Sequence, residues 1–213
     1  MKKIILLLLL SSLSLLLAAQ EIYTPGCLYD SYGNPLPVYW VNNNIELLGV
    51  PANTYGEAVS IIQFKGKILV FGNMIIENKK VPVVWEDTSR FTFVSFPWEY
   101  NECTIKKAFV IGERVYIIGG VKDNNDHHHG IVWQDIYHYK IITEENRETF
   151  IYDLDEINDE IVTAGYTKSY ITEEWKYYIS DEKYIDKDIF DEDSVSYIHK
   201  IKQIGGDISL RES

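Results

Sequence analysis

The chain has 213 residues, with 20 Lys and Arg against 32 Asp and Glu, which gives a formal net charge of −12. Such an acidic surface repels phosphate backbones and anionic lipids, which argues against nucleic-acid binding and against binding to a membrane surface. Sixteen tyrosines and only six prolines favour strands over helices or disorder. A chain of this length is sufficient for one sizeable domain.

Residues 1–19 have the pattern of a secretory signal peptide. Two lysines precede a Leu-rich run over residues 4–17, and Ala18-Ala19 supply small residues for cleavage. The apolar run is short for a membrane span, which needs about 20 residues, so an uncleaved N-terminal anchor is the alternative reading. We predict export to the periplasm, the cell surface or the extracellular medium, with no membrane insertion after cleavage.

From residue 20 onward the sequence repeats, and we expect residues 20–213 to form a single repeat domain. Four short apolar segments each end in a glycine, and these glycines lie 46, 47 and 46 residues apart. They are Gly26, Gly72, Gly119 and Gly165. Other apolar columns keep the same period, among them Ala58, Ile105, Ile151 and Ile198. A period of this length predicts a repeated supersecondary unit.

Each period contains the signals of four antiparallel strands. A short polar connection such as Gly112-Glu113-Arg114 joins the first two strands, and the second strand ends at the glycine. A third strand ends in an aromatic residue, and a short fourth strand follows it. The aromatic residues are Trp40, Trp85, Trp133 and Tyr178. Four strands in about 40–50 residues are typical of a β-propeller blade, so we predict that these aromatics pack between blades.

Two segments resemble known repeat families. The segment FVIGERVYIIGG (109–120) resembles a kelch-type blade, with an apolar strand, a tight turn, a second apolar strand and a glycine pair. The segment YWVN (39–42) is similar to the YW-x-N core of bacterial exported repeats. Both resemblances imply an all-β propeller. Neither implies a reaction, because propellers host many unrelated functions.

The repeat units are expected at approximately 21–66, 67–112, 113–158 and 159–204, with a partial strand at 205–213. The first unit opens on its second strand, whereas residues 195–204 supply a first strand at the other end. That strand could complete the first blade and close a four-bladed propeller, since interlocked ends remove exposed strand edges. The alternative is an open, partial propeller, which could close as a homodimer.

Cys27 and Cys103 are the two cysteines of the chain. An exported protein can join such a pair in a disulfide, and the even count permits it. Two free thiols are the alternative, because two cysteines do not make a disulfide framework.

The stretch DNNDHHHG (123–130) contains the candidate metal ligands. His127, His128 and His129 follow Asp126, and imidazole and carboxylate groups are ligands of Zn²⁺. Adjacent loop residues rarely point at one ion, so we favour a solvated loop between strands. Two acidic runs, at 153–160 and 186–194, suggest a Ca²⁺ site, although the first run lacks the ligand spacing of an EF-hand loop. We expect no cofactor.

The stretch FPWEYNEC (96–103) joins two predicted strands and places Trp98 and Tyr100 at a loop tip. Aromatics on the loops of a rigid scaffold can stack on sugars or on partner side chains. The alternative is that Trp98 folds back on its own blade.

No convergent catalytic set is present in the sequence: it lacks a nucleophile elbow and a glycine-rich phosphate loop. We therefore predict an exported, non-enzymatic module that binds a protein or a glycan through its loops. Two alternatives stay open. One is an enzyme or metal-dependent site that uses the acids of 181–193 or the histidines. The other is a remnant repeat protein without activity of its own.

Overall fold

The computed structural model describes residues 21–157, 160–180, 185–186, 198–204 and 207–212. All regular elements in these residues are β-strands, as the content of β-branched and aromatic residues predicts. In this part of the chain no helix is long and apolar enough to cross a membrane. The predicted signal peptide at 1–19 lies outside the described residues.

The strands form four antiparallel sheets and one hairpin, each built from consecutive strands. The first sheet contains β1 (Tyr23–Tyr29), β2 (Pro35–Val41) and β3 (Asn44–Leu47). The second contains β4 (Tyr55–Phe64), β5 (Lys67–Ile76), β6 (Lys79–Trp85) and β7 (Phe91–Phe93). The third contains β8 (Glu102–Ile111), β9 (Arg114–Lys122), β10 (His128–Trp133) and β11 (Tyr139–Ile142). The fourth contains β12 (Arg147–Ile157), β13 (Glu160–Ser169), β14 (Trp175–Ser180) and β15 (Ile185–Asp186). The C-terminal hairpin is β16 (Ile198–Ile204) and β17 (Asp207–Glu212). The predicted all-β class and its antiparallel unit of four strands are confirmed.

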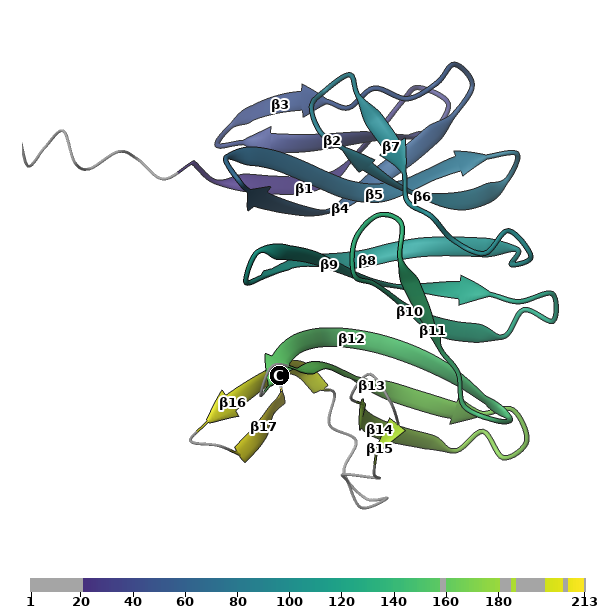
Figure 1. Cartoon of the computed structure of the whole chain (residues 1–213). Helices are drawn as coiled ribbons and strands as arrows, with labels where there is room; N and C mark the ends of the chain where they lie inside the picture. The colour runs from purple at the N-terminus through teal and green to yellow at the C-terminus, as the bar shows by residue number, and fades with distance from the viewer. Residues whose placement is uncertain (1–20, 158–159, 181–184, 187–197, 205–206, 213) are drawn as a thin grey trace, which may run out of the picture.

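The sheets lie one on another in chain order, and each contacts the next (Figure 1). β4 packs against β1 and β2, β8 packs against β4, β5 and β6, and β12 packs against β9 and β10. The first strand of each of these sheets therefore contacts the preceding sheet. β16 packs against β12 and β13, so the C-terminal hairpin continues this arrangement.

The position of the C-terminal hairpin shows whether the last strands complete the first sheet and close a propeller. β16 pairs with β17 in a sheet of its own, and this hairpin and the first sheet lie at opposite ends of the stack (Figure 1). The strand expected at 195–204 therefore does not complete the first sheet, which consists of β1, β2 and β3. Within the described residues the sheets form an open stack.

Three of the four closing glycines are required by a bulge in the neighbouring strand. Gly119 pairs with Ile105 of β8, and Lys106 is then an extra residue in that strand. A Cβ on Gly119 would lie 1.9 Å from the carbonyl oxygen of Thr104. Gly72 and Gly165 lie opposite the same kind of bulge, and a Cβ there would lie 2.0 and 1.8 Å from a carbonyl oxygen. The glycine column therefore reflects a steric requirement of the sheet.

The tryptophans join each sheet to the preceding one. Trp85 and Trp133 are fully buried, and their rings lie over the closing glycines. The indole N–H of Trp85 donates to the carbonyl of Gly49 at 2.8 Å, and that of Trp133 donates to the carbonyl of Ser95 at 2.6 Å. Gly49 and Ser95 lie on the connections that leave the preceding sheet. We call this contact the tryptophan clasp, and it confirms the predicted packing role of both residues.

Tyr178 covers Gly165 from a different position along its strand than the tryptophans have in theirs. It pairs directly with Gly165, whereas Trp133 pairs with Ile117, two residues before Gly119. The ring of Tyr178 still covers Gly165, and burial raises the pKa of its hydroxyl. The alignment of Tyr178 with the tryptophans is therefore wrong by two residues.

Each sheet has two distinct faces. The glycine face carries the closing glycine and its aromatic residue and points to the preceding sheet, and the back face points to the next one. Between the second and third sheets, the back-face residues Phe71 and Val84 share a core cluster with Ile117, Ile131 and Trp133. The interface between the third and fourth sheets repeats this form with Ile118, Val132, Ile151 and Tyr178.

The two cysteines lie in different sheets and are not joined. Cys27 lies half-buried on β1, and Cys103 lies buried on β8 in the core between the second and third sheets. Burial raises the pKa of the Cys103 thiol, which keeps it protonated. The structure therefore contains two free thiols in place of the disulfide that the sequence permits.

Candidate functional site

One end of the stack carries the turns between the second and third strands of each sheet and the connection from β7 to β8. We call it the loop end, and it includes residues 77–78, 96–101, 123–127 and 170–174 (Figure 1). Neighbouring loops contact each other there. The backbone N–H of Asn101 donates to the carbonyl of Lys122 at 2.8 Å, and its side-chain amide donates to the carbonyl of Asp123 at 3.2 Å. The predicted site residues Trp98, Tyr100 and 126–129 all lie at this end.

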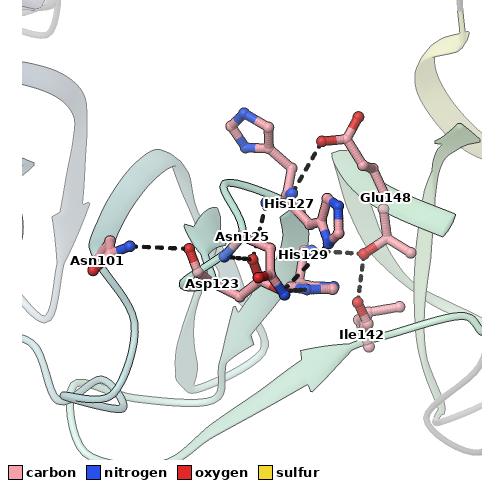
Figure 2. Close-up of polar contacts among 10 residues, drawn as sticks. Asn101, Asp123, Asn125, His127, His129, Ile142 and Glu148 are labelled. Carbon is pink, nitrogen blue, oxygen red and sulfur yellow. Dashed lines mark hydrogen bonds and ion pairs between the residues drawn. The ribbon is translucent and has the colours of Figure 1, made fainter. Parts of the chain in front are cut away.

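Asp123 organises the loop that holds the histidines (Figure 2). Its Oδ1 accepts the backbone N–H of Asn125 at 2.8 Å and that of His127 at 3.0 Å. Its Oδ2 lies 3.5 Å from Nδ1 of His127 and 3.5 Å from Nε2 of His129. Burial alone would raise the pKa of Asp123, but the N–H groups of His127 and Asn125 and the His129 ring outweigh it and lower the pKa. The carboxylate is therefore the acceptor that shapes the loop.

Residues 30–34 form the same loop in the first sheet without any histidine. Asp30 Oδ1 accepts the backbone N–H of Tyr32 at 2.8 Å and that of Asn34 at 2.9 Å. Gly33, with φ of 84°, stands where Asp126, with φ of 63°, stands in the histidine loop. The histidine loop is thus a recurring turn, and Asp123 is present because its side chain accepts the backbone N–H groups of that turn.

His128 does not converge with His127 and His129, because successive residues of an extended chain point to opposite sides. The His127 ring stacks on Tyr170, with centroids 3.9 Å apart. His128 instead lies beside Phe150 of the fourth sheet, at 5.2 Å, and desolvation lowers its pKa. Among the described residues no group of three or more His, Cys, Asp or Glu side chains is placed to hold a metal ion.

The acidic run at 153–160 has a structural role where it is described. Asp153 is buried, and its carboxylate lies 3.0 Å from Nζ of Lys107 on the third sheet. This ion pair links two sheets, so Asp153 is engaged within the protein. Residues 158–159 and nearly all of 186–194 lie outside the described residues.

Trp98 lies at the rim of a pocket between the second sheet and the connection to the third. Its side chain is 76% exposed, and its ring centroid lies 4.6 Å from that of the buried Phe96. Phe96 therefore supports one part of the indole ring while the rest is open to solvent. The pocket has a volume of about 160 Å³, and its lining includes Ile76, Glu77, Lys79, Phe96, Tyr100 and Asn101.

The polar part of the pocket comes from the tight turn between β5 and β6. Glu77 and Asn78 have φ values of 50° and 63°, which are typical of the two central residues of a hairpin turn. This turn carries Glu77 and Lys79 to the pocket, and Lys80, which also lines it, lies 3.4 Å from Glu57. The pocket thus combines an apolar floor with charged groups at one side.

Tyr100 links this pocket to the histidine loop. Its ring lines the pocket and also lies edge-on to the His129 ring, with centroids 6.2 Å apart. Burial raises the pKa of Tyr100, so its hydroxyl is a neutral hydrogen-bonding group at neutral pH. The two aromatic residues singled out in the sequence, Trp98 and Tyr100, are therefore brought together in one site.

Sequence reasoning missed the partners of these two aromatics. Ile76, Glu77 and Lys79 lie on a different hairpin, about 20 positions earlier, and nothing in the repeat pattern marks them. Asn101 could have been suspected, because it lies next to Tyr100 in the same connection.

Comparison with solved structures gives a distant similarity. The chain matches no protein-family model and no curated protein sequence. Among solved structures it is similar to a fucose lectin from Kordia zhangzhouensis in complex with methyl-fucoside. The TM-score is 0.45 at 12% identity, over 60% of this chain and 94% of that chain. A similarity at this level does not indicate a shared function.

Proposed function

We propose that the chain is an exported, non-enzymatic binding module that holds a saccharide in the pocket beside Trp98. One observation carries the proposal: an exposed tryptophan and several charged or amide groups share this pocket. The stacked sheets would act as a partial β-propeller, whose strands hold the loops in place. Export rests on the pattern of residues 1–19, and an exported protein that begins at Gln20 is the expected result of N-terminal sequencing.

The chemistry of the pocket suits a sugar ring. A pyranose has an apolar face of C–H groups and a rim of hydroxyl groups. The free part of the Trp98 ring offers a flat apolar surface to the C–H face of the sugar. The side chains of Glu77, Lys79 and Asn101 offer hydrogen-bond acceptors and donors to the hydroxyl groups. Small-molecule sites commonly combine an apolar wall with a few polar groups that fix orientation.

The volume of the pocket limits the ligand. Pockets for drug-sized molecules measure about 300–1,000 Å³. The pocket beside Trp98 measures about 160 Å³, so it suits a ligand with one ring, such as a terminal sugar of a longer glycan. Because few groups contact one ring, we expect weak binding to a single site.

A glycan array tests this function with two matched variants. We expect the native chain to bind a restricted set of glycans, and Trp98→Ala to lose that signal. Tyr137→Ala is the control, because Tyr137 is an exposed aromatic residue in the turn between β10 and β11, away from the loop end. Silence from the native chain, or equal binding by Trp98→Ala, contradicts the proposal. Capture of a protein through Trp98 without any glycan would support the protein-binding alternative instead.

A further inference from the structure

A second aromatic surface lies at the loop end, apart from the pocket beside Trp98. The His127 ring of the histidine loop stacks on the Tyr170 ring of the loop 170–174, with centroids 3.9 Å apart and an angle of 17° between the rings. The two loops come from the third and the fourth sheet. The His127 side chain is 36% exposed, Tyr170 is partly exposed, and Ile171 next to it is 76% exposed. We call His127 and Tyr170 the stacked pair.

Two sets of contacts join the stacked pair to that pocket (Figure 2). Asn101 lines the pocket, and its side-chain amide donates to the carbonyl of Asp123 at 3.2 Å. The carboxylate of Asp123 in turn lies 3.5 Å from Nδ1 of His127. Tyr100 also lines the pocket, and its ring lies edge-on to the His129 ring, with centroids 6.2 Å apart. The histidine loop therefore supports both the pocket and the stacked pair.

The separation of the two surfaces sets the length of a ligand that contacts both. The pocket lies between the second sheet and the connection to the third, whereas the stacked pair joins the loops of the third and fourth sheets. Facing sheets pack about 10 Å apart, so the two surfaces lie roughly one sheet spacing apart along the stack. A ligand that contacts both is therefore an extended chain of several sugar rings.

The charges around these surfaces argue against an acidic glycan. In the pocket lining Lys79 offsets Glu77, and Lys80 lies 3.4 Å from Glu57. Asp123, between the pocket and the stacked pair, is a carboxylate at neutral pH. The whole chain has a net charge of −12. Anionic sugars are therefore repelled, and the loop end suits a neutral glycan.

We propose that the loop end binds a linear, neutral oligosaccharide, with one sugar in the pocket beside Trp98 and a later sugar on the stacked pair. This inference rests on the proposed function and adds a second sugar site to it. The rings of His127 and Tyr170 offer an apolar surface to the C–H face of a pyranose. Burial raises the pKa of the Tyr170 hydroxyl, so this group is neutral and offers a donor and an acceptor to sugar hydroxyls. Joining two weak contacts in one ligand makes the second contact intramolecular and strengthens binding.

Titration of the mature chain with glucose, galactose, mannose and N-acetylglucosamine, and with their linear tetrasaccharides, tests the second site. For one of these sugars we expect the tetrasaccharide to bind about tenfold more tightly than the monosaccharide, through the added aromatic contact. Tyr170→Ala is expected to lose this gain but to bind the monosaccharide like the native chain, which also shows that the variant is folded. Tyr170→Phe keeps the ring and the gain. Tyr137→Ala, at an exposed position away from the loop end, is the control and binds both ligands like the native chain.

The NMR signals of the His127 ring give a second readout. We expect the tetrasaccharide to shift them together with the Trp98 indole signal, whereas the monosaccharide shifts only the Trp98 signal. Tetragalacturonic acid, an anionic chain of the same length, is expected not to bind, and binding equal to that of the neutral tetrasaccharide overturns the assignment to neutral glycans.

The outcomes separate the second site from the proposed function. A tetrasaccharide that binds no more tightly than its monosaccharide, or that leaves the His127 ring signals in place, overturns the second site while the proposed function stands. Loss of monosaccharide binding by Tyr170→Ala also overturns it, because Tyr170 would then only support the pocket. If no sugar moves the Trp98 signal, the proposed function fails and the second site fails with it.

Discussion

Gly119 and Gly120 are neighbours in β9 with opposite surroundings. A Cβ on Gly119 would lie 1.9 Å from the Thr104 carbonyl oxygen, whereas on Gly120 the nearest atom would be 3.7 Å away. We predict that Gly119→Ala lowers the free energy of unfolding by about 3 kcal/mol or more, because the backbone of β8 must move. Gly120→Ala should change it by less than about 1 kcal/mol. Urea unfolding of both variants measures the contrast, and equal effects would refute the bulge as the cause.

Asp123 makes stability depend on pH through the histidine loop. Its pKa is lower in the folded chain than in the unfolded chain. The unfolded chain therefore binds the proton first as pH falls, and the stabilisation present above about pH 4 is lost below it. We predict that Asp123→Asn has a shallower loss of unfolding free energy between about pH 5 and pH 3 than the native chain. Identical slopes in urea unfolding would show that the carboxylate has no such role.

At the scale of the element, the tryptophan clasp holds neighbouring sheets in register. Trp133→Phe keeps an aromatic ring near Gly119 but removes the N–H that donates to Ser95 at 2.6 Å. We predict a loss of about 2 kcal/mol of unfolding free energy, from the unpaired carbonyl and the smaller ring. Trp98→Phe is the control, because Trp98 is exposed and makes no clasp, and it should stay within about 0.5 kcal/mol of the native value. A native-like Trp133→Phe in thermal or urea unfolding contradicts the clasp.

The hairpins could be predicted from the sequence because their constraints recur with one period. Gly72, Gly119 and Gly165 are each forced by a bulge, so the same residue appears in each copy. The bulges themselves could not be predicted, because the extra residues Val59 and Lys106 share no side-chain property. A bulge inserts a backbone position, so the inserted residue itself carries no chemical pattern, and only the glycine opposite it does.

The candidate site was predictable only in part. Trp98 and Tyr100 stand out because exposed aromatics are unusual in a polar connection. Glu77 and Lys79 could not be assigned to them, because the pocket joins two loops that meet only when the second and third sheets stack. The metal interpretation of 126–129 stays a prediction: His127 and His129 both lie near Asp123, whereas His128 lies beside Phe150 of the fourth sheet.

At the scale of the whole molecule, the faces of the sheets and the loop end have different roles. Within the chain, the faces of the sheets bind other sheets. The loop end lies outside these sheet-to-sheet interfaces and carries the pocket beside Trp98.

The pocket beside Trp98 is the central claim, and the indole N–H spectrum of the native chain tests it most directly. The chain has five tryptophans, which serve as one probe in the pocket and four outside it. On titration with millimolar monosaccharides, we predict that one sugar shifts the Trp98 signal in a saturable way and leaves the signals of the other four tryptophans in place. A Trp98 signal that does not move with any sugar, or shifts confined to Trp175, would contradict the account.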